Sequence, residues 1–314
     1  MPPRSRTFKR TAYIVLAVLL LLAAGVASLI RPDIPFERLR AKYATPPSKF
    51  LDIGGLQVHY RDEGRGFPLV LLHGAASSLF TWDAWAADLS KDYRVIRYDL
   101  PGFGLTGPNA TRDYSMAWHV RFLEAFLDKL NVPACYLAGN SFGGRIAWQF
   151  AYAHPERVKK LILVDASGYP VPERKILAMR LAKMPVIGLI LEYTTPRFFV
   201  AMTVRQTYGD PSRVTDAVVD RYYDLIRRAG NREAFGILNR TSMQDSSARI
   251  QKLGVPTLIL WGSEDRGIPV SCAERFHRDI RNSQLIVYRS VGHIPMEEIP
   301  AETIRDTRAF LAAQ

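Results

Sequence analysis

The stretch Leu137-Ala138-Gly139-Asn140-Ser141-Phe142-Gly143-Gly144 lies between a short apolar, β-prone run and a helix-like run at residues 145–151. A strand, a sharp turn carrying Gly-x-Ser-x-Gly and a helix form the pattern of a nucleophile elbow, which lifts the serine hydroxyl clear of a sheet. Glycines flank the serine because side chains there would collide across the turn. The pattern therefore predicts Ser141 as a nucleophile.

The same stretch predicts part of an oxyanion hole. The backbone amide of Phe142, at the start of the helix, is expected to point to the position where a substrate oxyanion forms. A second buried strand is predicted at residues 68–72, and it leads into His73-Gly74-Ala75-Ala76. We expect the amide of Ala75 to lie opposite that of Phe142, because two convergent N–H groups stabilise an oxyanion.

Length and composition limit the class of protein. At 314 residues and 48% hydrophobic content, the chain can bury one large core, and alternating β and α patterns indicate one α/β domain with an insertion. The net charge of +12 does not come with a basic stripe interleaved with aromatic residues, so the sequence predicts no nucleic-acid partner. Cys135 and Cys272 do not indicate a disulfide framework, and their redox state is left open.

The N-terminus has the composition of a membrane segment. Basic residues precede an uncharged, mostly apolar run at residues 11–30, and about 20 apolar residues suffice to cross a bilayer. Residues 1–30 are therefore predicted to be a transmembrane anchor. The catalytic domain is expected on the extracytoplasmic side, because the denser basic cluster precedes the helix. A cleaved signal peptide, with Gly25-Val26-Ala27 as the cleavage site, is the alternative.

Four segments follow the N-terminal one. Residues 31–47 contain several prolines and are predicted to be a linker, and residues 48–168 carry the first part of the α/β pattern. Residues 169–245 show helical periodicity without a clear strand, and the α/β alternation then resumes in residues 246–314. We expect residues 169–245 to form a helical cap that packs on the core and lines part of an apolar substrate pocket.

A serine nucleophile needs a base to take its proton. Of the six histidines, only His293 is expected on a loop that follows a late strand, at the edge of the sheet where α/β folds place their chemistry. The other histidines are predicted in the early hairpin, the oxyanion loop, helices or a helix end. The sequence therefore predicts His293 as the base.

A carboxylate must orient the histidine. Asp265 follows the predicted buried strand at residues 256–261, one strand before the histidine, and is the predicted acid. Asp165, at the end of the preceding strand, is the second candidate, and Glu264 is the third. Asp99 also ends a strand, but we interpret it as a carboxylate that holds a turn.

These motifs, in this order, resemble those of the α/β-hydrolase fold superfamily over residues 48–312. The markers are His73-Gly74, residues 99–104 (Asp-Leu-Pro-Gly-Phe-Gly), residues 139–144, residues 262–265 (Gly-Ser-Glu-Asp) and Gly292-His293. The resemblance implies a mostly parallel eight-stranded sheet, flanked by helices, with a helical cap inserted after strand six. With its predicted membrane anchor and cap, the chain is similar to the monoacylglycerol-lipase-like and esterase branches of this superfamily.

We therefore expect a serine hydrolase that cleaves carboxylic esters, lipid-like or with an apolar acyl group, through an acyl-enzyme. The small-molecule ester and, through the N-terminal helix, the membrane are the expected partners, and no cofactor or metal is expected. A carbon–carbon bond hydrolase of meta-cleavage products and a cofactor-free haloperoxidase-like enzyme also fit the resemblance. A binding protein without turnover is the alternative from another class. The sequence does not indicate the oligomeric state.

Overall fold

The sheet at the centre of the computed structural model has eight strands in the order β1-β2-β4-β3-β5-β6-β7-β8. The structure describes residues 4–171, 181, 184–241 and 245–313. β2 pairs antiparallel with β1 and β4, and all other neighbours are parallel. The strands are β1 (Lys49–Ile53), β2 (Leu56–Glu63), β3 (Pro68–Leu72), β4 (Arg94–Tyr98), β5 (Cys135–Asn140), β6 (Val158–Val164), β7 (Thr257–Gly262) and β8 (Ser283–Tyr288). The predicted mostly parallel sheet is confirmed.

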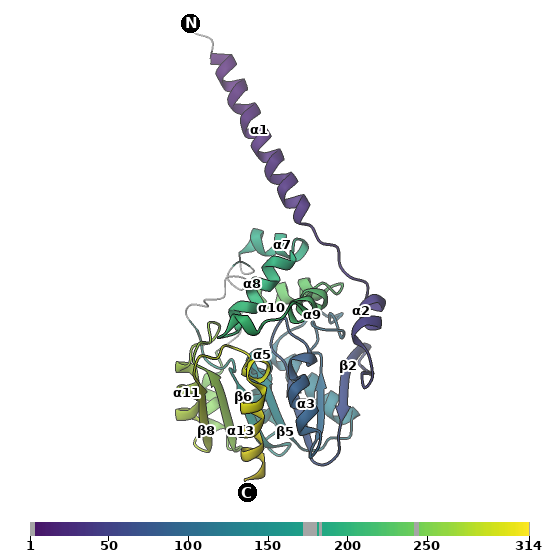
Figure 1. Ribbon diagram of the computed structural model, residues 1–314, viewed down its shortest axis with the longest axis vertical. Coiled ribbons are helices and arrows are strands. Elements are labelled where there is room, and N and C mark those ends of the chain that lie inside the picture. Colours follow the sequence, from purple (N-terminus) through teal and green to yellow (C-terminus); the bar gives the residue numbers. More distant parts are fainter. Residues whose placement is uncertain (1–3, 172–180, 182–183, 242–244, 314) are drawn as a thin grey trace.

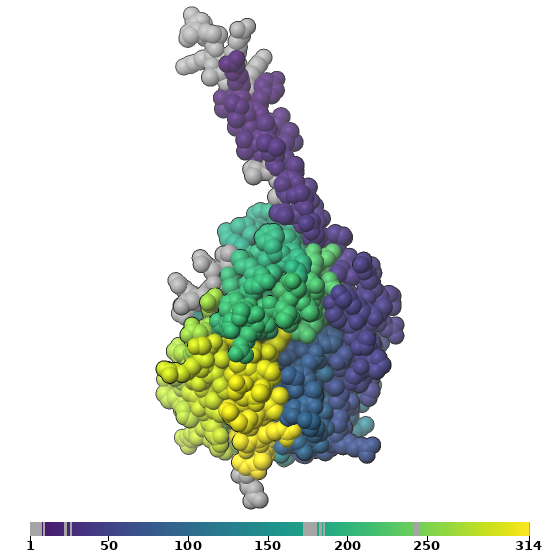
Figure 2. Space-filling model, viewed as in Figure 1, coloured from purple at the N-terminus to yellow at the C-terminus, as the bar shows by residue number. Residues whose placement is uncertain are grey.

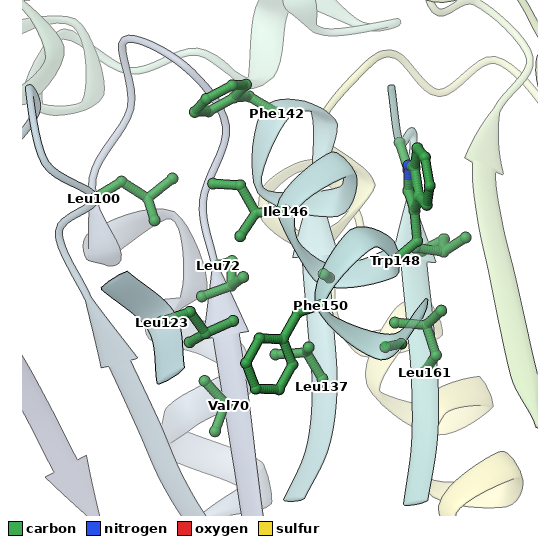
Figure 3. Close-up of a cluster of buried hydrophobic side chains, with 14 of the residues drawn as sticks. Val70, Leu72, Leu100, Leu123, Leu137, Phe142, Ile146, Trp148, Phe150 and Leu161 are labelled. Atoms are coloured by element: carbon green, nitrogen blue, oxygen red, sulfur yellow. The ribbon is translucent and has the colours of Figure 1, made fainter. Parts of the chain in front are cut away.

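Two apolar layers cover the two faces of the sheet. In β3, Val70 and Leu72 contact one layer, whereas Leu69 and Leu71 contact the other, as the alternation of side chains along a strand requires. Figure 3 shows part of the first layer, in which Val70 and Leu137 pack beside Phe150. The first layer includes helices α4 (Met116–Lys129), α5 (Ser141–Ala153) and α11 (Ser271–Asp279); the second includes α3 (Asp83–Leu89) and α13 (Pro300–Ala312). Both faces are buried, as a parallel sheet needs.

Four α-helices among the described residues lie between β6 and β7 and form the cap at one end of the sheet (Figure 1). They are α7 (Pro185–Tyr193), α8 (Arg197–Thr207), α9 (Asp216–Ile226) and α10 (Asn231–Arg240). Residues 172–180, 182–183 and 242–244 of the predicted cap lie outside the described residues. The expected helical insertion after strand six is confirmed.

The prediction of a membrane anchor is corrected. Helix α1 (Arg4–Leu29) projects away from the rest of the chain in Figure 1. Crossing a bilayer needs about 20 consecutive, mostly apolar residues in one helix. Among the described residues, no helix meets this requirement for length and apolar content. The predicted anchor, and the extracytoplasmic placement that depended on it, therefore lose their basis.

Residues 31–44, which were expected within a linker, pack against the cap, and we call them the N-terminal strap. Arg31 N–H donates to the carbonyl of Tyr193 in α7 (2.9 Å), and Ile34 N–H donates to the carbonyl of Arg227 after α9 (2.7 Å). The strap contains helix α2 (Phe36–Tyr43), whose Leu39 is 1% exposed. Figure 2 shows these first residues, in purple and dark blue, lying against the green cap.

Candidate active site

Ser141 is the first residue of α5 and directly follows β5, where its φ of +53° places it in the left-handed region. Glycine is required around it because of close backbone contacts. A Cβ atom on Gly139 would lie 2.4 Å from the carbonyl oxygen of Gly143, and one on Gly143 would lie 2.4 Å from that of Leu72. A Cβ on Gly144 would lie 2.5 Å from the Cβ of Ala166. The sequence Gly-x-Ser-x-Gly-Gly thus produces a tight strand–turn–helix that holds the serine in a strained conformation.

Asn140 connects this turn to two other strand ends. Its Nδ2 donates to the carbonyl of Val164 at the end of β6 (3.1 Å) and to the carbonyl of His293 (3.0 Å). Ser167 N–H donates to the carbonyl of Ser141 (3.0 Å). The sequence analysis did not assign a role to Asn140, although its place directly before the nucleophile was visible in the motif.

Asp265 and His293 form a buried pair. Asp265 Oδ2 lies 2.7 Å from His293 Nδ1, and the Asp265 side chain is 0% exposed. Asp265 Oδ1 accepts the backbone N–H groups of Gly267 (2.6 Å) and Ile268 (3.0 Å). A carboxylate at Nδ1 fixes the tautomer with the proton on that atom, which leaves Nε2 free to accept a proton. Ser141 and His293 both line the same cavity.

The two other candidate acids occupy different positions. Asp165 directly follows β6 and is fully buried, and one oxygen of its carboxyl group, one of Asp265 and a ring nitrogen of His293 lie within 4.8 Å of one another. Glu264 is exposed, and its carboxylate lies 3.5 Å from the hydroxyl of Ser263. Among the described residues, the Asp165–Asp265–His293 group is the one set of His, Cys, Asp and Glu side chains close enough to hold a metal ion.

Asp99 holds two turns, as the sequence predicts. Its carboxylate accepts the backbone N–H groups of Leu79 and Leu105, both at 2.7 Å, and lies 2.7 Å from His59 Nδ1. Burial alone would raise the pKa of Asp99, but the charge and hydrogen bond of His59 outweigh it and hold this pKa below its usual value. The hydrogen bonds of the Asp99 carboxylate therefore go to these two turns and to His59.

His73 shapes the predicted oxyanion loop. Its Nδ1 donates to the carbonyl of Gly74 (2.7 Å), and its Nε2 accepts the N–H of Leu100 (2.8 Å). Burial lowers the pKa of His73, so the ring stays neutral and keeps both bonds. The loop packs closely against the elbow: a Cβ atom on Gly74 would lie only 3.2 Å from the Cβ of Ser141.

The two predicted oxyanion residues differ in how they face the site. Ala75 lines the cavity together with Ser141. Phe142 is not among the described residues that line the cavity; its ring is buried and contacts His119 edge-on, with ring centroids 5.1 Å apart. At the start of α5 its N–H is one of the amides without a partner inside the helix. The convergence of these two amides on one oxyanion stays a prediction.

The cavity at Ser141 has a volume of about 160 Å³ and extends into the cap. Most of its wall is apolar, and the polar groups include Ser77, Tyr222, Glu192 and Arg232. The apolar part of the wall is formed by Leu191, Phe199, Val200, Val204, Ile226 and Phe235 from the cap, and by Ile294 next to the histidine. The sequence predicted an apolar cap but could not show which of its side chains face the serine.

A polar network beside the cavity was also missed by the sequence analysis. Tyr222 from α9 donates to Glu297 Oε2 (3.1 Å), which also accepts the hydroxyl of Thr81 (2.7 Å). Ser77 Oγ lies 3.3 Å from the Tyr222 hydroxyl. Burial raises the pKa of Tyr222, so it stays protonated as a donor. This network joins the cap to the loop that carries Ala75 and to the helix after His293, α12 (Pro295–Glu298).

The comparisons with known proteins show the family to which the chain belongs. The profile of the alpha/beta hydrolase fold matches residues 68–300, and the chain belongs to this family of hydrolases. It is 31% identical over 274 residues to the 2-hydroxy-6-oxo-2,4-heptadienoate hydrolase of Pseudomonas putida, an alignment that covers 83% of this chain and 95% of that protein. It is 29% identical to the 2-hydroxymuconate semialdehyde hydrolase of a Pseudomonas species, over 82% and 91% of the two chains.

Solved structures of two kinds are similar to this one. A membrane phospholipase A described as a bacterial virulence factor has a TM-score of 0.73 and 25% identity, over 96% of this chain and 98% of that one. A meta-cleavage product hydrolase from Pseudomonas fluorescens has a TM-score of 0.74 and 28% identity, over 84% and 97%. The comparisons thus establish a hydrolase, but they do not distinguish hydrolysis of an ester from hydrolysis of a carbon–carbon bond.

Proposed function

We propose that this chain is a serine hydrolase that cleaves carboxylic esters with an apolar acyl group through an acyl-enzyme. The observation that carries the proposal is the mostly apolar cavity that runs from Ser141 and His293 into the cap. A cavity of this kind binds an alkyl chain by removing it from water, at about 25 cal/mol per Å² of apolar surface buried. The similarity to a phospholipase and the predicted triad support the same reaction class.

In the proposed mechanism, His293 Nε2 takes the proton of Ser141 while the serine oxygen attacks the ester carbonyl carbon. Asp265, 2.7 Å from Nδ1, holds the ring and stabilises its cation. The amides of Ala75 and Phe142 stabilise the oxyanion, and each such donor contributes roughly 3 kcal/mol. His293 then protonates the departing alcohol, and a water molecule repeats the sequence to release the acid.

A carbon–carbon bond hydrolase is the second candidate, because two of the similar proteins act on carboxylate-bearing dienes or semialdehydes by their names. Such a substrate needs a cation in the cavity. Among the described lining residues, Arg232 is the cation, and it donates to Asp33 (2.6 Å) and to the carbonyl of Arg31 (2.8 Å). Its Nε and Nη1 have no partner among the described residues. The ion pair with Asp33 already uses part of the charge of Arg232, which favours the ester, whereas the two nitrogens without a partner, Nε and Nη1, favour the diene.

One experiment separates these candidates. The purified protein and its Ser141→Ala variant are treated with a fluorophosphonate probe and assayed with p-nitrophenyl esters from acetyl to palmitoyl and with 2-hydroxy-6-oxo-2,4-heptadienoate. The ester proposal expects labelling that Ser141→Ala abolishes, and ester turnover with a chain-length optimum. Turnover of the dienoate without ester turnover, lost in Arg232→Met, would establish the second candidate. Absence of labelling in folded protein would refute both.

A further inference from the structure

Asp165 is a fully buried carboxyl group that the mechanism above does not use. It directly follows β6, with a φ of +44°, and its N–H continues the sheet by donating to the carbonyl of Leu260 (3.0 Å). Asp165 Oδ1 accepts the N–H of Gly262 at the end of β7 (3.0 Å). Its other oxygen, Oδ2, is buried without a donor among the described residues. Such an unsatisfied atom beside an active site calls for an explanation.

The neighbours of Asp165 are acidic. One oxygen of Asp265 and a ring nitrogen of His293 lie within 4.8 Å of it. Glu298 in α12 is also buried, and it accepts three backbone N–H groups, those of Gly209, Asp210 and Gly292, at 2.8–3.0 Å. Asp165 therefore lies close to the Asp265 carboxyl group, and the negative charge of Glu298 acts on it as well. Negative charges that are buried together repel one another.

The two neighbouring aspartates, Asp165 and Asp265, differ in the number of N–H donors that their carboxyl groups accept. Asp265 accepts three N–H groups, from Gly267, Ile268 and His293, and such donors favour the ionised form of a carboxyl group. Asp165 accepts one, from Gly262. Burial, and then the charge of Asp265, raise the pKa of Asp165 well above its usual range. Of the two, Asp265 has the donors that a carboxylate needs, and Asp165 lacks them.

We propose that Asp165 carries a proton and donates it to the Asp265 carboxylate, so that it is a positioning residue for the Asp265–His293 pair. This assignment accounts for Oδ2, because a protonated oxygen needs an acceptor and not a donor. The Asp265 carboxylate has a remaining lone pair for it, since three are used by N–H groups. No proton leaves Asp165 during the reaction.

The hydrogen bond has two consequences for His293. It fixes the Asp265 carboxylate that holds the ring, and it withdraws part of the negative charge that stabilises the protonated ring. Without it, more of the negative charge of Asp265 would act on the protonated ring, and the acidic limb of kcat/KM, which reports the free base, would move to higher pH. The kinetic part of this inference rests on the proposed function; the protonation of Asp165 does not.

The protonation is tested first without turnover. The infrared difference spectrum between wild-type protein and Asp165→Asn at pH 7 is recorded, with Glu264→Gln as the matched control. We expect the wild type to show the C=O stretching band of a protonated carboxyl group and Asp165→Asn to lose it, while Glu264→Gln, which changes an exposed carboxylate, keeps it. If the band is absent from the wild type, Asp165 is ionised and the proposal is wrong, whatever the activity of the protein.

The positioning role is tested by pH–rate profiles of the same ester assay. Asp165→Asn can accept from Gly262 with Oδ1 and donate to Asp265 with Nδ2, so it should keep the acidic limb in place. Asp165→Gly removes the group and suits the positive φ at this position, so its limb should move up by roughly half a unit to one unit. Asp165→Ala, checked for folding by circular dichroism, should behave like the glycine variant. An unmoved limb in both truncations, or an equal shift in Asp165→Asn, would overturn the role.

Discussion

The side-chain amide of Asn140 donates a hydrogen bond of 3.0 Å to the backbone carbonyl of His293, so the residue before the predicted nucleophile holds the loop of the predicted base. The same amide donates to Val164 (3.1 Å). In a reaction that depends on the geometry between serine and histidine, a displacement of about 1 Å can reduce the rate by roughly 100-fold. This bond should therefore help to fix the distance over which the proposed proton transfer takes place.

Replacing Asn140 with alanine should lower kcat of the ester assay by roughly 10-fold or more, because the histidine loop loses this tether. It should also lower the free energy of unfolding by about 1–3 kcal/mol, since two buried carbonyls lose their donor. Asn239→Ala is the matched control, because Asn239 in α10 donates to a carbonyl of its own helix. An Asn140→Ala enzyme with the kcat of this control would show that the tether is dispensable.

The elbow glycines should not tolerate a methyl group. A Cβ on Gly143 would lie 2.4 Å from the Leu72 carbonyl oxygen, and one on Gly144 would lie 2.5 Å from the Ala166 Cβ. We expect Gly143→Ala and Gly144→Ala each to reduce the free energy of unfolding in urea by about 1–3 kcal/mol or more. Gly254→Ala, where nothing lies within 4 Å of the added carbon, should leave it unchanged; equal losses in all three variants would contradict this reading.

His119 should make the protein less stable in acid. Burial lowers the pKa of His119 to about 3, whereas in the unfolded chain it is about 6.5. At a pH between these two pKa values, His119 is protonated in the unfolded state and neutral in the folded state. The free energy of unfolding therefore falls as pH falls, by about 1.4 kcal/mol per pH unit. Urea titrations at pH 7, 6 and 5 should show a shallower decline for His119→Phe. Parallel declines would mean that His119 is protonated in the folded protein.

The N-terminal strap should contribute to stability through Leu39. This side chain is 1% exposed and packs in one cluster with Leu225 of the cap and with Phe80 and Leu105 of the core. Leu39→Ala should reduce the free energy of unfolding by about 2–4 kcal/mol. Arg38→Ala, one position earlier on the exposed side of the same helix, is the control. An equally small effect of both would show that the strap is not part of the cooperative unit.

The sequence predicted the sheet, the elbow and the Asp265–His293 pairing partners because each depends on local patterns. Buried strands of a parallel sheet are continuous apolar runs, and the chemistry lies where these strands end. The sequence analysis treated Asp165 and Asp265 as alternatives for one role. That both lie in one buried group depends on β6 and β7 being neighbours and on the turn at φ +44°. The packing of Ile34 and Leu39 was missed because prolines in residues 31–47 suggested an unstructured connection.

The N-terminal strap also limits how far the chain can be truncated from its N-terminus. The family profile begins at residue 68, and the first strand begins at Lys49. A truncated protein designed from the profile or from the strands would therefore omit the N-terminal strap. Such a shortened protein would keep every residue of the proposed chemistry but would lose Asp33, the acceptor that orients Arg232 in the cavity wall. It would also remove Ile34 and Leu39 from the cluster that buries Leu225. A fragment meant to report substrate preference faithfully has to start no later than residue 31.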